Sequence, residues 1–293
     1  MQLTNHAGAM LENFLQALEI TAAVKTLKRI VLVTGCKQYG VHLGQVKNPM
    51  LESDPWLRDP SWPPNFYYRQ QDILKAFCEK HSNVSWVVTY PNDVIGFAKG
   101  NFMNMASGLG IYVAVTKELG RDLVWPGSET FYTRFDCFTC SKLHARFCEW
   151  AALESRAGNE AFNVVNGDVQ SWQDLWPRVA KRFGLKVKAD QFLGGSELAS
   201  SVVLETPPPI SVWAKEVGLE GDIPPSRLEQ RVNLVKWSRQ KEVKDAWDRL
   251  AAREGLQKDA FEKATWDFLD FILGRNFDVV ISMSKAREMG WTG

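Results

Sequence analysis

In the first 185 residues, segments with the hydrophobic spacing of amphipathic helices alternate with short apolar runs typical of buried strands. Residues 9–26 place apolar side chains mostly three or four positions apart, as at Met10, Phe14 and Leu18, which predicts a helix. Residues 29–35 form a short β-branched run that ends in glycine. Such a run is typical of a parallel strand that is covered on both faces.

The same alternation continues as far as residue 183. The first strand is followed by a long connection, residues 37–65, which is rich in proline and glycine; a long loop beside a sheet often lines a site. The remaining predicted elements are helices over 66–81, 104–119, 136–154 and 172–183 and strands over 84–90, 123–125 and 161–165. This alternation predicts an α/β fold with a parallel sheet.

The pattern changes after Gly184. Glycine and proline clusters come first, and helical stretches that contain tryptophan follow over 226–275. We therefore predict two domains, residues 1–185 with the sheet and residues 186–293 as a mainly helical cap. The sequence contains no internal repeat.

Composition excludes several classes of protein. The chain has 293 residues, a formal net charge of +1, 45% hydrophobic and 24% charged residues, which argues against a disordered chain or a basic nucleic-acid binder. No apolar stretch approaches the ~18 residues of a membrane helix, and the N-terminus lacks the basic region of a signal peptide. Five cysteines are an odd number, which fits reduced thiols. We expect a cytoplasmic protein without nucleic-acid or membrane partners.

Cysteine and histidine spacing suggests a metal motif at one place only. Cys137, Cys140, His144 and Cys148 have the residue types of a zinc site. If Asp136 caps a single helix here, the first and last cysteine lie about 16 Å apart along its axis, too far to share one ion. We therefore expect no metal.

Motifs for nucleotide or serine-hydrolase chemistry are missing. Gly108 and Gly110 lack a third glycine and follow no strand, and neither a Walker sequence nor a Gly-x-Ser-x-Gly elbow occurs. The four histidines stand in no known motif.

Lys37 and the pair Tyr67–Tyr68 are the best candidates for chemistry from the pattern alone. Lys37 directly follows a predicted strand end, where ligands of α/β sheets bind. A nearby ammonium would lower the pKa of a tyrosine and prepare it for proton transfer. A solvated lysine and two tyrosines that only pack in the core would give the same pattern. At this point the residues can therefore be catalytic or merely structural.

Several motifs in order resemble the progesterone 5-beta-reductase and iridoid synthase-like family of extended short-chain dehydrogenases. They are TGCKQYG at 34–40, NFYY at 65–68, YPNDVIGF at 90–97, NEAFN at 159–163, NGD at 166–168 and MSKAREMG at 283–290. The similarity extends, with gaps, over nearly the whole chain. It implies a Rossmann-like NAD(P)-binding domain followed by a substrate-binding cap.

The resemblance implies NADPH-dependent reduction of an activated carbon–carbon double bond or a carbonyl. The family's catalytic tyrosine and lysine correspond to Tyr67 and Lys37. The Tyr-x3-Lys motif of ordinary short-chain dehydrogenases is absent, since Gln71 and Asp72 stand four positions after the two tyrosines. The expected chemistry is hydride delivery to an enone β-carbon while Tyr67, supported by Lys37, stabilises the enolate.

The resemblance also suggests where cofactor and substrate would lie. Asp93, Val94, Asn101, Phe102 and Met103 are expected near the nicotinamide end of the cofactor. The expected substrate is a small apolar metabolite of specialised metabolism, and a homo-oligomer is left open. Several aromatic residues would either line the substrate pocket or pack in the core: Trp213, Trp237, Trp247, Trp266, Phe268 and Phe271.

The chain also departs from the family pattern. The glycine-rich loop after the family's first strand has no counterpart, and Tyr90 replaces the arginine that precedes the family's proline. The expected fold is thus a partial Rossmann-like, doubly wound parallel sheet whose first strands are missing, with an uncovered edge at residues 30–33. Three interpretations follow: a truncated reductase, a cofactor-independent cyclase or isomerase, and a non-catalytic partner subunit.

Overall fold

The computed structural model describes residues 2–98 and 101–293, and a three-stranded parallel sheet forms its centre. The strands β1 (Arg29–Val33), β2 (Ser85–Pro91) and β6 (Glu160–Val164) lie in the order β1-β2-β6. Arg29 is paired with Ser85, and Val87 with Glu160. This confirms the predicted parallel α/β sheet.

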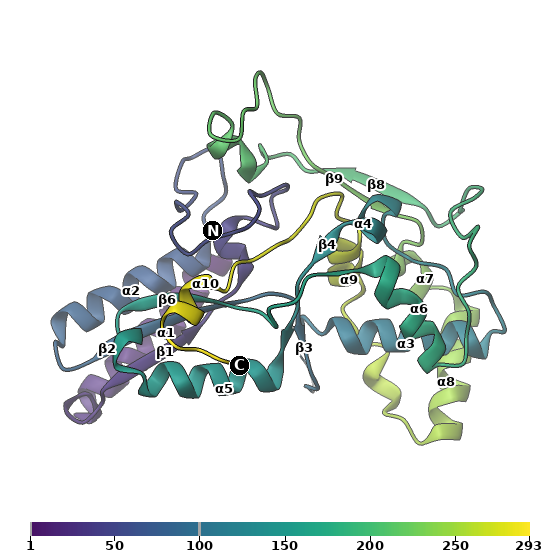
Figure 1. Ribbon diagram of the computed structural model, residues 1–293. Helices are drawn as coiled ribbons and strands as arrows, with labels where there is room; N and C mark the ends of the chain where they lie inside the picture. The colour runs from purple at the N-terminus through teal and green to yellow at the C-terminus, as the bar shows by residue number, and fades with distance from the viewer. Residues whose placement is uncertain (1, 99–100) are drawn as a thin grey trace.

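Helices cover both faces of this sheet. Successive side chains of a strand point to opposite faces. Thr89 of β2 accordingly contacts His144 of α5 (Ser141–Leu153), whereas Tyr90 bonds to Gln71 of α2 (Phe66–Lys80). Figure 1 shows the sheet between these two helices, with α1 (Gln2–Ile20) packed along α2. The sheet is therefore doubly wound, as expected.

A second group of helices forms the other side of the molecule in Figure 1. It consists of α3 (Met105–Glu118), α6 (Trp172–Arg182), α7 (Leu234–Ser238), α8 (Lys241–Glu254) and α9 (Trp266–Leu273). Their apolar faces meet around a tryptophan-rich core that includes Trp125, Trp176, Trp237, Trp247 and Trp266. Three of the aromatic residues considered for the ligand pocket are thus core residues.

The two hydrophobic cores do not follow the chain in sequence order. The core around the sheet includes residues 277–291 near the C-terminus, and the tryptophan-rich core includes α3 and α6 from the first half of the chain. Both cores contain residues from both sides of residue 185. The domain boundary at this residue stays a prediction.

Several local predictions were wrong. The helix expected over 136–154 begins only at Ser141, after the short strands β4 (Phe135–Asp136) and β5 (Thr139–Cys140). Residues 123–125 form no strand. Their apolar side chains, Leu123 and Trp125, pack in the tryptophan-rich core instead. The mainly helical cap also contains two strands, β8 (Ser200–Val203) and β9 (Arg227–Gln230), which form an antiparallel pair.

Short elements complete the described structure. They are β3 (Val94–Ile95), which pairs with β5, β7 (Gln170–Ser171), which pairs with β4, and the helices α4 (Glu129–Thr133) and α10 (Ser284–Glu288). Single 3-10 turns occur at Ala23–Lys25, Cys36–Tyr39, Ser155–Ala157, Pro209–Trp213 and Lys258–Ala260.

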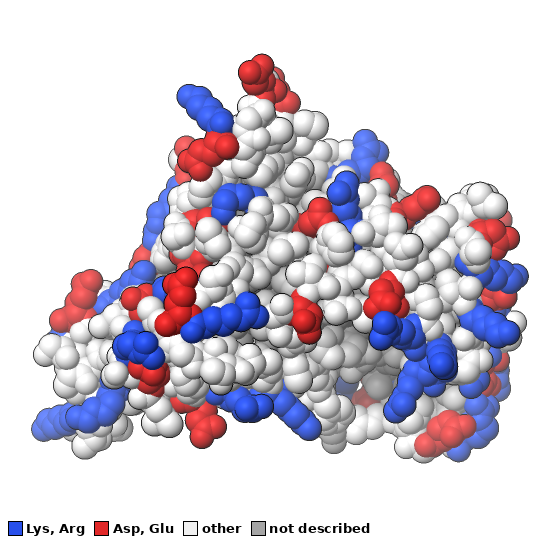
Figure 2. Space-filling view, viewed as in Figure 1, with Lys and Arg blue, Asp and Glu red and all other residues white. Residues whose placement is uncertain are grey.

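The surface carries the features expected from composition. Figure 2 shows basic and acidic side chains interspersed over the face in view, consistent with a net charge of +1. Strand β1 lies at one edge of the described sheet, and Val33 at its end is 51% exposed. Within residues 2–98 and 101–293, no helix combines the length and the apolar character needed to cross a bilayer.

Candidate active site

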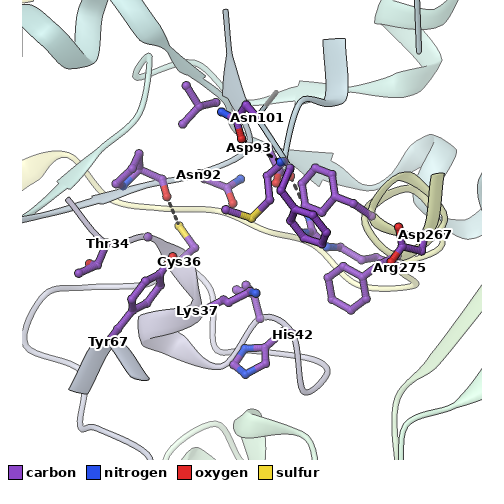
Figure 3. Close-up of a pocket in the computed structure, with 18 residues that line it drawn as sticks. Thr34, Cys36, Lys37, His42, Tyr67, Asn92, Asp93, Asn101, Asp267 and Arg275 are labelled. Atoms are coloured by element: carbon purple, nitrogen blue, oxygen red, sulfur yellow. Dashed lines mark hydrogen bonds and ion pairs between the residues drawn. The ribbon is translucent and has the colours of Figure 1, made fainter. Parts of the chain in front are cut away.

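A cavity of about 320 Å³ lies where β1 and β2 end. Both strands are parallel, so their carboxyl ends meet at one edge of the sheet, the position where α/β sheets bind ligands. Figure 3 shows residues from the loop after β1, the end of β2 and helix α9 around this space. The lining residues are Thr34, Gly35, Cys36, Lys37, Val41, His42, Tyr67, Pro91, Asn92, Asp93, Val94, Asn101, Phe102, Met103, Asp267, Phe268, Phe271 and Arg275.

The end of β1 has the local structure needed for close packing. Thr34 continues the pairing with β2, because its N–H and its hydroxyl both donate to the carbonyl of Thr89, at 3.0 and 3.1 Å. At Gly35 a Cβ atom would lie 3.3 Å from both Tyr67 Oη and the carbonyl of Pro91. The missing side chain therefore lets the phenol of Tyr67 approach the strand ends.

Asn65 holds the two candidate catalytic residues together. As N-cap of α2 it accepts a hydrogen bond from the backbone N–H of Tyr67 at 3.0 Å. Its amide Nδ2 donates to the carbonyl of Lys37 at 2.7 Å. One side chain thus links the first turn of α2 to the loop after β1.

Tyr67 has a buried ring and a hydroxyl that is free for a ligand. The residue is only 7% exposed, yet its hydroxyl is not enclosed and bonds to no residue in the described part of the chain. Burial, with a further contribution from Cys36, raises the pKa of Tyr67 to about 12. The phenol is therefore neutral near pH 7 and can donate a hydrogen bond.

Lys37 lies on the same side of the cavity and is half-buried. Desolvation lowers the pKa of its ammonium group, and no carboxylate of the described residues pairs with it. The expectation that Lys37 would lower the pKa of Tyr67 was wrong, because the burial of the phenol outweighs any effect of the ammonium.

His42 is a lining residue that sequence reasoning missed. It lies beside Lys37 (Figure 3), and burial together with the charge of Lys37 lowers the pKa of His42 to about 4. The imidazole is therefore neutral at physiological pH. Its place in a glycine-rich loop offers no periodic or motif signal that could have identified it.

A buried charge cluster forms the opposite side of the cavity. Arg275 Nη1 lies 3.0 Å from Asp93 Oδ2 and 3.9 Å from an Asp136 carboxylate oxygen. Asn92 donates from Nδ2 to Asp136 Oδ1 at 3.2 Å. Burial, together with the charge of Asp93, raises the pKa of Asp136 to about 8, so this acid is mostly protonated at pH 7.

Asp136 differs from its expected role, whereas the role expected of Asp93 stays a prediction. Asp136 caps no helix: it is 2% exposed and lies in β4. Asp93, expected at the cofactor, does line the cavity, but its carboxylate is paired with Arg275. Arg275 itself was missed because it stands 182 positions away from Asp93, so no local pattern connects them.

Apolar side chains form the rest of the wall. Phe268 and Phe271 of α9 line the cavity, together with Val94, Phe102 and Met103 from the segment around β3. Phe102 is 64% exposed, so it forms an apolar rim at the opening rather than part of the core. An apolar wall with a few polar groups is typical of a small-molecule site.

All seven residues predicted to act at the site line this one cavity. They are Tyr67, Lys37, Asp93, Val94, Asn101, Phe102 and Met103. The structure thus brings together segments around residues 37, 67, 93 and 102 that are separate in the sequence, while the individual roles remain predictions.

The cysteine-rich segment is arranged differently from the helix we assumed. Cys137 lies between β4 and β5 and donates from Sγ to the carbonyl of Val279 at 3.3 Å, so the argument from a single helix was wrong. His144 contacts Cys148 at 3.6 Å within α5. In the described part of the chain, no three His, Cys, Asp or Glu residues are placed to hold a metal ion.

Known proteins resemble nearly the whole chain. An uncharacterized protein of Schizosaccharomyces pombe is 44% identical over 97% of this chain and 70% of its own length. The short chain dehydrogenase gsfE of Penicillium aethiopicum is 31% identical over 97% of this chain and 68% of its own length. The 3-oxo-Delta(4,5)-steroid 5-beta-reductase of Arabidopsis thaliana is 30% identical over 98% of this chain and 64% of its own length.

These relatives are longer than the chain, which spans between 64% and 70% of their length. A family described as the PRISE-like Rossmann-fold domain matches residues 7–202, two thirds of the sequence and most of the residues that line the cavity. The chain therefore belongs to the PRISE-like Rossmann-fold family.

Proposed function

We propose that this chain is an NADPH-dependent reductase whose cavity binds the substrate and donates a proton to it. The substrate would be a small apolar metabolite with a carbon–carbon double bond conjugated to a carbonyl, or a reducible carbonyl. The observation that carries the proposal is the pair of free donors, Tyr67 Oη and Lys37 Nζ, on one cavity at the carboxyl ends of the strands. Two relatives are named as a dehydrogenase and a reductase, which supports the same reaction class.

The residues around the strand ends suit the nicotinamide end of such a cofactor. Gly35 leaves room beside Pro91 and Tyr67 that a Cβ atom would fill, and Asn92 and Val94 continue the same wall. Nothing in this chain matches the glycine-rich turn that binds pyrophosphate, so the fit concerns the nicotinamide end alone. When bound, NADPH would supply a hydride, two electrons with one hydrogen, to the substrate.

The chain's own residues would polarise the substrate carbonyl. The neutral phenol of Tyr67 donates a hydrogen bond to the carbonyl oxygen, and the ammonium of Lys37 stabilises the negative charge that builds there. As the β-carbon gains hydrogen, the π bond breaks and its electrons move to the oxygen as an enolate, which takes a proton from Tyr67. The rings of Phe268 and Phe271 limit water at this point.

Turnover of cyclohex-2-en-1-one with NADPH tests the proposal. Absorbance at the reduced-nicotinamide band follows the cofactor, and mass spectrometry shows whether the product has gained two hydrogens. Tyr67→Phe should lower kcat/KM by at least about 100-fold. Tyr132→Phe is the matched control, because Tyr132 is equally buried, bonds to no described residue through its hydroxyl and lies away from the cavity.

The outcomes separate the candidate functions. Equal turnover of the two variants would refute the role of Tyr67. A product with the mass of its substrate would refute the reductase and indicate an isomerase or cyclase. A folded chain without any turnover would favour a non-catalytic subunit.

A further inference from the structure

Three hydrogen-bond donors, not two, line the same side of the cavity. Figure 3 shows Lys37 and His42 next to each other, with the phenol of Tyr67 on the same side and Arg275 and Asp267 opposite. Neither the hydroxyl of Tyr67 nor the ammonium of Lys37 bonds to another described residue. The cavity therefore has an unused polar side, and His42 is the member whose role is unexplained.

The two ring nitrogens of His42 have different surroundings. Nδ1 is completely buried and has no hydrogen-bond partner among the residues that the structure describes. Nε2 has no such partner either, but it is not buried. Only Nε2 can therefore meet a ligand or water.

The burial of Nδ1 decides where the imidazole carries its proton. A neutral imidazole has one N–H, and a buried N–H without a partner costs the full penalty of its desolvation. With the proton on Nε2, the N–H can bond to water or to a ligand. His42 is neutral above pH 5 because burial and Lys37 lower its pKa to about 4. The ring therefore offers an Nε2–H donor beside Lys37.

We propose that His42 donates a hydrogen bond from Nε2 to the carbonyl oxygen that Tyr67 and Lys37 polarise. This inference rests on the proposed function and adds a catalytic residue to it. A neutral donor suits the position, because it stabilises charge on the oxygen without adding a second cation beside Lys37. It also gives the half-buried imidazole of His42, whose Nδ1 has no partner among the described residues, a function that the fold alone does not explain.

Three substitutions separate this role from a packing role. His42→Gln keeps an N–H near the position of Nε2, His42→Asn places its N–H near the buried Nδ1, and His42→Leu has no donor. We expect kcat/KM for cyclohex-2-en-1-one to fall roughly ten-fold in the Asn and Leu variants and less than about three-fold in the Gln variant. Circular dichroism of each variant controls for folding.

The kinetic outcomes distinguish this inference from the proposed function. If Tyr67→Phe loses turnover while His42→Leu keeps it, the proposed function stands and the role of His42 is refuted. If all three His42 variants lose turnover equally while remaining folded, the donor is not responsible and the inference is again refuted. If the unsubstituted chain has no turnover, the proposed function fails, and the spectroscopic test alone decides the role of His42.

Nitrogen NMR of chain labelled with ¹⁵N-histidine provides that independent test. The resonance lost in His42→Gln identifies His42 among the four histidines. We expect a protonated Nε2 and an unprotonated Nδ1, and a shift of the Nε2 resonance when cyclohex-2-en-1-one is added. Methylenecyclohexane, which has a similar shape but no oxygen, should leave the resonance unchanged. A proton on Nδ1, or equal responses to both compounds, would overturn the inference.

Discussion

Arg275 is the residue whose loss should destabilise the fold most clearly. Its side chain is 2% exposed and lies between two buried carboxyl groups, 3.0 Å from Asp93 Oδ2 and 3.9 Å from Asp136. Arg275→Met removes the guanidinium of this cluster and leaves both carboxyl groups buried. Because Asp136 is mostly protonated at pH 7, the charge left without a partner is that of Asp93. Asp93 must then lose its charge, or the site must open to solvent.

The expected magnitude follows from the burial of all three groups. Breaking a buried ion pair by removing one partner costs about 3–5 kcal/mol, because the other charge remains uncompensated. A typical domain has only about 5–15 kcal/mol of unfolding free energy. Urea unfolding followed by circular dichroism at pH 7 should therefore show a midpoint at least about 1 M lower for Arg275→Met, given a typical urea dependence of 1–3 kcal/mol per M.

Two further variants make this reasoning refutable. In the double variant Arg275→Met with Asp93→Asn, no uncompensated charge remains, so we expect recovery of about half of the lost unfolding free energy. Arg253→Met removes an exposed guanidinium that pairs with Glu118 and should leave the midpoint nearly unchanged. A midpoint for Arg275→Met equal to that of Arg253→Met, or a double variant less stable than Arg275→Met, would refute the argument.

Two other predictions concern the cluster and the cap of α2. The raised pKa of Asp136 means that the folded chain holds a proton that the unfolded chain releases, so the free energy of unfolding should fall as pH rises from about 4 to 8. In Asp136→Asn, the slope of the urea midpoint against pH should become flatter. An unchanged slope would refute the assignment of this proton to Asp136. Asn65→Ala should cost about 1 kcal/mol of unfolding free energy and should also lower kcat, because the side chain of Asn65 connects Tyr67 with Lys37. The control variant Asn233→Ala, which removes the N-cap of α7, should lower stability but leave kcat unchanged.

The sequence predicted those parts of the site that depend on local structure. Lys37 follows a strand that its own β-branched residues specify, and Tyr67 lies in a helix that begins with an Asn N-cap. Because parallel strands end at the same edge of a sheet, the topology places the loop after β1 and the start of α2 near that edge. Local pattern and simple topology were enough to place these two segments at one edge, whereas the catalytic roles of Lys37 and Tyr67 came from the family resemblance and stay predictions.

Tertiary contacts decided the parts that could not be predicted. The helix expected from Asp136 is replaced by β4 and β5, because Thr139 donates to the carbonyl of Val164 at 2.6 Å and accepts from the N–H of Asn92 at 3.0 Å. These bonds join positions 25 and 47 residues apart. They outweigh the helical spacing of the cysteines, and no pattern within the segment reveals them.

The two halves of the cavity therefore have different origins. The loop after β1 and the first turn of α2 supply the donors Lys37, His42 and Tyr67 from within about 30 residues of sequence. The opposite wall comes from α9 and Arg275, which reach the cavity only through the packing of the second core. Substitutions in the first half should change the rate of the chemical step, whereas substitutions at Phe268 or Phe271 should change which substrates fit, because apolar walls act through shape and burial.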